Sequence, residues 1–321
     1  MAFLIHFIHF IHSFNKGWMF RGMVGRKIPS QIKRDVRRRC GFGCVVCGLP
    51  LYEYDHLLGF AEVKRHLAEE ITLLCDKHHR ERTSGMLPTA AVVAADASPY
   101  NLHRGTSSPY HLHFSGDECY VQVGSSKFMV GRPIGDTVLL PIVIDNFAPL
   151  SFRSEDGRLL LGVELHDEHD QVVLSVVDNE LVYAVGSWDI EFVGRNLVLR
   201  SGCGSTFVDL AFDPPGGIVV KKGRLLHGGV EVIVEREWVA ISDTHYLIRN
   251  FTSISSVGFA LGEYALGVNA GVRISPLPRR LRSDPRAGYI LARKRVKAAE
   301  DDLRQVKENL AKRGIGIRGI N

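Results

Sequence analysis

Residues 40–83 read CGFGCVVCGLPLYEYDHLLGFAEVKRHLAEEITLLCDKHHRERT, with a pair of metal-binding side chains near each end. Two residues separate Cys44 from Cys47, and two residues likewise separate Cys75 from His78. Thiolates and an imidazole in two such pairs are typical ligands of a closed, tetrahedral Zn²⁺ site. Because a loop-rich segment of this size buries little apolar surface, bound zinc would supply much of its folding free energy. The spacing therefore predicts a small zinc-stapled module.

A second motif is interleaved with the first one. Tyr54-Asp55-His56 stands between the two pairs, and His79 directly follows the second pair. The composite C-x2-C … D-H … L-C-x2-H-H-x2-R-T resembles the HNH endonuclease family, whose pattern is commonly C-x2-C … D-H … N … L-C-x2-C-H-x2-K. The resemblance covers residues 40–83 and implies the ββα-metal fold, in which a β-hairpin and a helix hold one divalent cation. It therefore implies an enzyme that hydrolyses phosphodiester bonds.

The resemblance also implies roles for single residues. His56 matches the general base that takes a proton from the attacking water, and an imidazole suits this role because its pKa lies near neutral pH. Asp55 and His79 match the ligands of the catalytic cation, which we expect to be a divalent metal such as Mg²⁺ or Mn²⁺. Two arginines that follow, Arg80 and Arg82, are expected to bind phosphates of the nucleic acid.

Two positions depart from the family pattern. His78 replaces the fourth Cys, and Zn²⁺ accepts either ligand. Glu70 stands where the family has its central Asn, which helps to pin the loop that carries the base, and an ionised Glu cannot donate a hydrogen bond. We therefore count Glu70 among the candidate catalytic residues and expect altered or weak catalysis. The alternatives are a purely structural zinc site and a non-catalytic zinc module that binds nucleic acid.

The positive charge of the chain is concentrated around this motif. Residues 16–82 contain 14 basic and 8 acidic residues, a balance of +6, whereas the whole chain has a net charge of +5. A basic surface favours a polyanionic partner, because phosphates that it neutralises release their counterions. We therefore predict nucleic acid, and double-stranded DNA in particular, as the partner; a solvated basic face without a partner is the alternative.

The cysteines indicate the compartment. The chain has six, which is too sparse for a small disulfide-stabilised secreted scaffold. Three of them belong to the predicted zinc site, which indicates a reducing, cytoplasmic compartment. Cys119 and Cys203 have no partner at metal-binding spacing, and we interpret them as packed or unreactive thiols.

Local patterns predict three elements within residues 28–90, the nuclease-like domain. A short basic helix is expected over residues 28–39, with Ser30 as its N-cap. Alternating side chains predict a strand over residues 51–56, and a helix with apolar residues facing inward is expected over residues 69–83. His66, which lies between these elements, is interpreted as a surface or loop residue.

Beyond this domain the composition changes. Residues 91–110 are rich in Ser, Pro, Ala and Gly and are predicted to be a linker, although PTAAVVAADA favours a short helix. From residue 111 to 275, short apolar runs alternate with turn residues at spacings of about 8–12, which is typical of an all-β domain. The acidic turn Asp167–Asp170 is interpreted as a solvated hairpin tip, with cation binding as the alternative. We expect this domain to serve recognition.

The two ends of the chain carry their own patterns. Residues 1–27 begin with an apolar stretch shorter than the roughly 20 residues that cross a bilayer, so we expect no stable membrane insertion. We interpret them as a tail or as an upstream extension that the working protein does not carry, and a weak interfacial helix is the alternative. Residues 276–321 combine a charged linker with an amphipathic helix, predicted from the heptad pattern of Tyr289, Val296, Leu303 and Leu310. That helix is expected either to form a homodimer or to dock on the β-rich domain. The fold class predicted for the whole chain is α+β: a zinc-stapled ββα-metal module, an all-β domain and a C-terminal helix.

Overall fold

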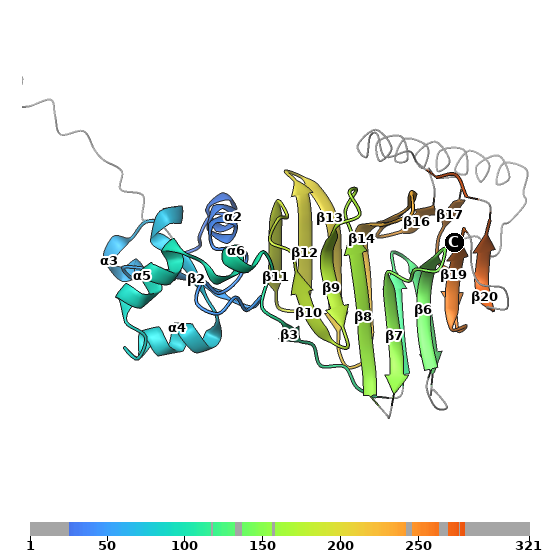
Figure 1. Ribbon diagram of the computed structural model, residues 1–321, viewed down its shortest axis with the longest axis horizontal. Coiled ribbons are helices and arrows are strands. Elements are labelled where there is room, and N and C mark those ends of the chain that lie inside the picture. The colour runs from blue at the N-terminus through green and yellow to red at the C-terminus, as the bar shows by residue number, and fades with distance from the viewer. Residues whose placement is uncertain are drawn as a thin grey trace, which may run out of the picture.

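The computed structural model describes residues 26–116, 118–131, 137–155, 158–241, 246–262, 269–275 and 277–279. These residues form two adjoining units, a mixed unit near the N-terminus and a larger unit made of strands (Figure 1). They confirm the α+β class, with mostly strands and few helices. The predicted N-terminal tail (residues 1–25 of it) and the predicted C-terminal helix lie outside the described residues. None of the helices that the structure describes is long and apolar enough to cross a membrane.

The first unit is organised around a two-stranded hairpin. Its elements in chain order are α2 (Ser30–Arg39), β1 (Glu53–His56), α3 (Phe60–Val63), the 3₁₀ helix η1 (Ala68–Glu70), β2 (Ile71–Leu74), α4 (Asp76–Thr83), α5 (Thr89–Ala97) and α6 (Tyr100–Arg104). β1 and β2 pair antiparallel, with Asp55 opposite Thr72 and His56 opposite Ile71. α4 follows β2 directly, so two strands and a helix succeed one another along the motif that holds the candidate site residues.

The helix predicted over residues 69–83 is wrong in its first half. Residues Ile71–Leu74 form strand β2, and the helix begins only at Asp76. All four side chains of β2 are buried, which removes the alternation by which a strand is recognised in sequence. The expected cap is also wrong: α2 begins at Ser30 itself, Pro29 precedes it, and no side chain caps its N-terminus.

Residues 91–104, which were predicted to be part of a linker, pack with the first unit. They include most of α5 and all of α6, and both helices have fully buried side chains. Val92 of α5 packs with the apolar core of the first unit. Asn101 of α6 donates a 3.0 Å hydrogen bond from its side-chain amide to the carbonyl oxygen of Gly41. The composition of this segment resembles a linker because its helices bury few large side chains.

The second unit consists of two β-sheets. One sheet has the strand order β20-β19-β6-β7-β8-β9-β10-β3, and the other has the order β11-β12-β13-β14-β15-β16-β17. β4 extends the second sheet by pairing parallel with β14, and β5 lies between β4 and β18. The strands are β3 (Tyr110–His111), β4 (Glu118–Val123), β5 (Ser126–Gly131), β6 (Thr137–Ile144), β7 (Leu150–Glu155), β8 (Arg158–His166), β9 (Val172–Val177), β10 (Glu180–Tyr183), β11 (Asp189–Val193), β12 (Asn196–Gly202), β13 (Ser205–Asp213), β14 (Gly217–His227), β15 (Val230–Glu235), β16 (Trp238–Ile241), β17 (Tyr246–Ile248), β18 (Thr252–Ser253), β19 (Val257–Leu261) and β20 (Ala270–Ile274).

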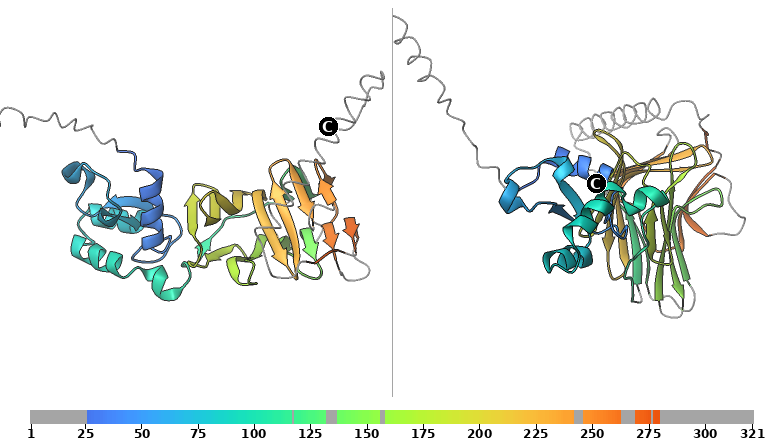
Figure 2. Two further views of the ribbon diagram at one scale, coloured as in Figure 1. Left: turned by 90° about the horizontal axis from the view of Figure 1, so that it is seen from above. Right: turned by 60° about the vertical axis from the view of Figure 1, so that its left-hand side comes forward.

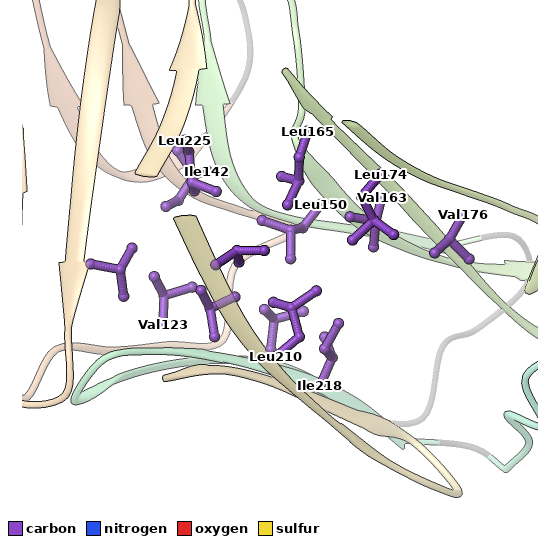
Figure 3. Close-up of a cluster of buried hydrophobic side chains, with 14 of the residues drawn as sticks. Val123, Ile142, Leu150, Val163, Leu165, Leu174, Val176, Leu210, Ile218 and Leu225 are labelled. Carbon is purple, nitrogen blue, oxygen red and sulfur yellow. The ribbon is translucent and has the colours of Figure 1, made fainter. Parts of the chain in front are cut away.

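The two sheets enclose one apolar core (Figure 3). Leu165 and Leu174 reach into it from the first sheet, and Leu210 and Ile218 reach into it from the second. Alternate residues of β8 are buried, as expected for a strand with one face on a core and the other toward solvent. The helices of the first unit gather at one end of this sandwich (Figure 2).

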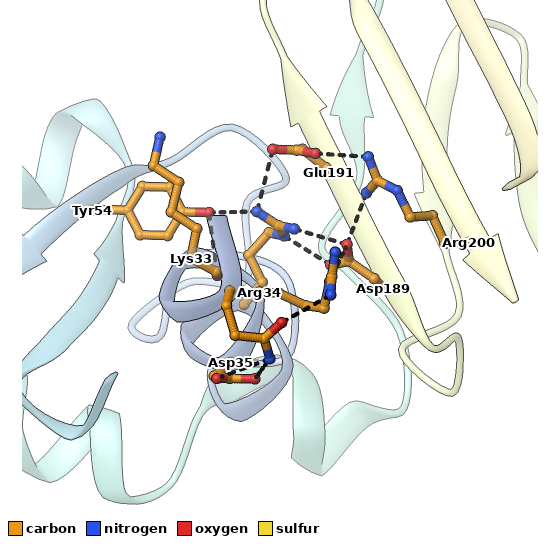
Figure 4. Close-up of polar contacts among 9 residues, drawn as sticks. Lys33, Arg34, Asp35, Tyr54, Asp189, Glu191 and Arg200 are labelled. Carbon is orange, nitrogen blue, oxygen red and sulfur yellow. Dashed lines mark hydrogen bonds and ion pairs between the residues drawn. The ribbon is translucent and has the colours of Figure 1, made fainter. Parts of the chain in front are cut away.

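A cluster of buried and partly buried charges joins the two units (Figure 4). Arg37 of α2 makes two hydrogen bonds of 2.8 Å to Asp189 of β11 and one of 3.2 Å to Glu191. Arg200 of β12 approaches the same two carboxylates, at 2.8 Å from Asp189 and 3.0 Å from Glu191. Arg37 also donates to the hydroxyl of Tyr54 in β1, at 2.8 Å. The cluster thus connects the hairpin of the first unit to the second sheet of the sandwich.

Candidate metal-binding and active site

The structure brings the four predicted zinc ligands together. Cys44, Cys47, Cys75 and His78 form a group in which all ligand atoms lie within 4.8 Å of one another, and it is the one such group found among the described residues. His78 Nδ1 lies 3.3 Å from the sulfurs of Cys44 and Cys75, and the sulfurs of Cys47 and Cys75 are 3.7 Å apart. Ligands at the usual Zn–S and Zn–N distances occupy tetrahedron corners about 3.6–3.8 Å apart. The group could therefore bind a metal such as zinc.

Local backbone geometry explains why the ligands converge. Cys44 and Cys47 lie on a tight turn that Gly48 closes, with a 2.7 Å hydrogen bond from its amide to the carbonyl of Cys44. Gly48 has φ +75°, a conformation that glycine adopts without strain. Val45 of this turn donates to the carbonyl of Leu73 in β2, which sets the turn against the hairpin. Cys75 stands between β2 and α4, so His78 follows it one helical turn later.

The thiols in this group affect each other's proton affinity. A hydrogen bond with Cys47 lowers the pKa of Cys44, against the effect of burial. The same contact raises the pKa of Cys47, as burial also does. A thiolate on Cys44 is therefore favoured even before a metal is considered, and the thiolate is the form of Cys that binds metal.

Asp55 and His79 meet on one side of the hairpin. Asp55 Oδ1 lies 3.7 Å from His79 Nε2, and the other ring nitrogen of His79 lies 3.1 Å from a carboxylate oxygen of Glu53. Glu53 and Asp55 are two residues apart in β1, and side chains at that spacing share one face of a strand. That face of β1 is the one turned toward α4, which supplies His79.

The two predicted phosphate-binding arginines lie in different environments. Arg82 is mostly buried, forms an ion pair with Asp55, and donates to the backbone carbonyls of His56 and Leu57 at 3.0 and 2.6 Å. It therefore holds the C-terminal end of β1 in place in this structure. Arg80 is 74% exposed on the same helix and pairs with Asp76 at 3.6 Å, so it remains accessible to a phosphate.

His56 projects from the other side of β1 and meets His66, the residue interpreted from the sequence as a surface or loop residue. His56 Nε2 lies 3.1 Å from Nδ1 of His66, and both residues are buried. The ring of His66 stacks on Phe60 of α3, with centroids 5.0 Å apart. His66 thus lies in a loop, one of the two positions expected for it, but it is buried rather than at the surface: the loop between β1 and β2 folds back and covers His56.

Glu70 holds the same loop through an ion pair. Its carboxylate accepts hydrogen bonds from Arg65, one of them 3.0 Å long from Nε, and the pair lowers the pKa of Glu70. The backbone carbonyl of Glu70 accepts a 2.9 Å bond from the amide of Leu57, the residue after His56. Glu70 therefore contacts Leu57, next to the candidate base, and holds the following loop through its ion pair with Arg65. The Asn of the family pattern would use a neutral amide side chain at this position.

The environment shifts the pKa of both central residues away from their ordinary values. Burial raises the pKa of Asp55, and the positive charges of Arg82 and His79 oppose this effect. Burial lowers the pKa of His56, and the neighbouring His66 adds to the lowering while Asp55 opposes it. A lowered pKa keeps the His56 imidazole neutral at pH 7, which is the form that can accept a proton.

Three residues of this site were missed in the sequence. Glu53 could have been found, because the strand alternation that places Asp55 also places Glu53 on the same face. His66 and Arg65 follow His56 at spacings with no periodic meaning, and the fold of the loop alone brings them to it. No family model matches the chain, and neither a curated protein nor a solved structure matches it significantly.

Proposed function

We propose that this protein is a zinc-stapled, metal-dependent endonuclease that hydrolyses phosphodiester bonds in DNA. The observation that carries the proposal is the 3.7 Å distance between Asp55 Oδ1 of β1 and His79 Nε2 of α4. His56, the candidate base, directly follows Asp55 in β1. Sequence resemblance to the HNH pattern and the order of strand, strand and helix point in the same direction.

The donor pair fits a divalent cation. Two ligands bound at about 2.1 Å to one octahedral ion lie about 3–4.2 Å apart, and the separation of Asp55 Oδ1 from His79 Nε2 falls in this range. Glu53, at 3.1 Å from the other nitrogen of His79, would orient the imidazole in the way that carboxylates orient metal-binding histidines. A cation held by Asp55 and His79 would neutralise charge on the scissile phosphate.

The residues of the chain supply the other requirements. His56 is the candidate general base, with a pKa held below its ordinary value mainly by burial. To act as a base it must exchange its contact with His66 for one with water, because His56 Nε2 faces His66 at 3.1 Å. α2 places Arg38 exposed and Lys33, Arg34 and Arg39 partly exposed on the surface of this unit, and Arg80 on α4 adds another exposed cation. Such a surface favours binding to phosphates.

A second candidate function is binding of nucleic acid without cleavage. In this structure Asp55 is paired with Arg82, Glu70 with Arg65 and His56 with His66, so each candidate catalytic group already has a protein partner. A zinc module whose polar groups serve stability would have these contacts. The cysteine and histidine ligands and the basic α2 would then suffice for its function.

Cleavage of supercoiled plasmid distinguishes the two functions. The full-length, zinc-loaded chain is incubated with plasmid and Mg²⁺, Mn²⁺ or EDTA, alongside His56→Ala and the control His103→Ala, which changes an exposed histidine of α6. The endonuclease requires nicking that depends on the cation, is lost in His56→Ala and persists in His103→Ala. Binding of plasmid by all three proteins without any nicking would rule out catalysis and favour the second function.

A further inference from the structure

A pocket lies at the junction of the two units, beside α2. It has a volume of about 510 Å³, within the range of about 300–1,000 Å³ that is usual for small-molecule sites. Arg38 of α2 lines one side, the turn between β8 and β9 lines another, and the segment between β10 and β11 together with β12 lines the rest. The charged and aromatic side chains of its lining include Arg38, Asp167, Glu168, Trp188 and Arg200. Figure 4 shows part of this junction, with Arg34 on α2 facing the strands that carry Asp189 and Arg200.

Arg38 gives the pocket a cation that can bind an anion. Its side chain is exposed on α2, and in the part of the chain that the structure describes no carboxylate lies within ion-pair distance of it. Arg200, the other guanidinium in the lining, is already bound by Asp189 and Glu191 at 2.8 and 3.0 Å. An incoming phosphate would therefore be attracted to the Arg38 side, along the basic face of α2.

Trp188 gives the pocket an aromatic surface. The residue is partly exposed, and two guanidinium groups of α2 lie near its ring, Arg34 at 4.6 Å and Arg38 at 6.0 Å from the centroid. Arg34 also pairs with Asp189 at 3.6 Å, so Arg38 is the one of the two that can hold a phosphate. An indole on which a base can stack, next to such a cation, is the usual combination in proteins that bind single-stranded nucleic acid.

The acidic turn gives the pocket hydrogen-bond acceptors. Asp167 Oδ1 accepts bonds from the amides of His169 and Gln171, at 2.8 and 3.0 Å, which fixes the turn. Glu168 projects from it as an exposed carboxylate. These carboxylates repel phosphate, so they exclude the backbone from their side of the pocket. They accept hydrogen bonds from amino groups, which cytosine and adenine present on their base edges and thymine does not.

From these features we propose that the pocket binds one unpaired base of a nucleic-acid strand, stacked on Trp188, with its phosphates on Arg38 and its amino group on Glu168 or Asp167. The inference rests on the proposed function, since it takes nucleic acid to be the substrate. In duplex DNA the base would have to leave the stack, a step that other enzymes acting on DNA also require. The second unit thereby contributes to substrate recognition.

Oligonucleotide binding tests the pocket without any cleavage. Fluorescence anisotropy is measured with the full-length, zinc-loaded chain and labelled dC12, dT12 or rC12, in buffer without Mg²⁺ or Mn²⁺. We expect dC12 to bind about tenfold more tightly than dT12, since one well-placed base contact discriminates by about that factor. Glu168→Gln, which can donate as well as accept, is expected to abolish this preference. Tighter binding of rC12 than of dC12, with the same response to Glu168→Gln, would assign the strand to RNA.

Two further variants separate stacking from charge. Trp188→Ala is expected to weaken binding of dC12 and dT12 alike by about tenfold, and Trp188→Phe is expected to restore most of it. Arg38→Ala is expected to weaken binding of both oligonucleotides. It should also reduce the slope of log affinity against log salt concentration by about one, the contribution of one phosphate contact. The matched control is Arg236→Ala, an exposed arginine in the turn between β15 and β16, which is expected to bind as the parent chain does.

The base-binding proposal and the endonuclease proposal can each fail while the other holds. Equal binding of dC12 and dT12, unchanged in Glu168→Gln and Trp188→Ala, would overturn the proposal that the pocket binds a base, even if the plasmid is nicked. A preference for dC12 that Glu168→Gln removes would support the pocket even if the plasmid stays intact, and would leave a protein that recognises bases without cutting.

Discussion

Arg37 and Asp189 form two parallel hydrogen bonds of 2.8 Å across the junction of the two units, and their side chains are 3% and 0% exposed. Arg37 lies in α2, whereas Asp189 is the first residue of β11. Because Arg37 also binds the Tyr54 hydroxyl in β1, the pair fixes the strand of the candidate active site against the sandwich. The same contact positions α2 beside the pocket proposed for a base.

Asp189→Asn should destabilise the protein strongly. The substitution removes the charge that faces Arg37, and breaking a buried pair typically costs about 3–5 kcal/mol. We expect the lower end of this range, because Glu191 remains 3.2 Å from Arg37. The measurement is urea-induced unfolding. Asp178→Asn is the control, since Asp178 pairs with Arg153 on the surface, where such pairs contribute about 0–1 kcal/mol. Equal losses in the two variants would contradict a stabilising role of the buried pair.

Short-range spacing made the candidate metal-binding cluster predictable. Cys44 and Cys47 lie on one turn, and Cys75 and His78 lie one helical turn apart, so each half of the site is encoded within four residues. Short apolar runs between turn residues in 111–275 likewise indicated a β-rich unit, because strands and the turns that end them are both local features of the sequence.

Other features depend on contacts between distant residues. Arg37 and Asp189 are separated by 152 positions, and neither side chain carries a local pattern that identifies the other. The strand Ile71–Leu74 was assigned to a helix because both of its faces are buried, which leaves no period to recognise. His66 reaches His56 only through the path of the intervening loop.

Cys75→Ser should release the metal and unfold the first unit. A serine hydroxyl is a poor ligand for Zn²⁺, and a closed zinc site contributes folding free energy directly. We expect the parent chain to hold about one zinc ion at this site and the variant to lose it, as measured by metal analysis of the dialysed protein. Circular dichroism should report lost helix while the strand signal persists. Cys203→Ser, which changes an exposed thiol, should retain the metal. Full zinc content in Cys75→Ser would refute the assigned ligand set.

Glu53→Gln should weaken the response to Mg²⁺ without affecting zinc. A carboxylate oxygen of Glu53 lies 3.1 Å from Nδ1 of His79, and loss of such an outer contact typically lowers metal affinity or activity by about 10–100-fold. The expected result is plasmid nicking that requires a correspondingly higher Mg²⁺ concentration. Glu62→Gln changes an exposed carboxylate of α3 and serves as the control. An unchanged Mg²⁺ dependence in Glu53→Gln would show that His79 needs no orientation by this carboxylate.

Gly48→Ala should disturb the turn that holds Cys44 and Cys47 by more than the strain of a positive φ at residue 48 explains. Gly48 and Gly85 have similar φ values, +75° and +78°, so alanine is strained at both by about 1–2 kcal/mol. A Cβ at Gly48 would also lie 2.2 Å from Oδ1 of Asn101, whereas nothing lies within 4 Å of one at Gly85. Asn101 is fully buried and bonded to Gly41, so it cannot move aside without losing that bond. We therefore expect Gly85→Ala to retain zinc and lose only the strain energy in urea unfolding, and Gly48→Ala to lose more stability and bind zinc more weakly. Equal behaviour of the two variants would mean that the turn shifts freely and that α6 does not support the metal site.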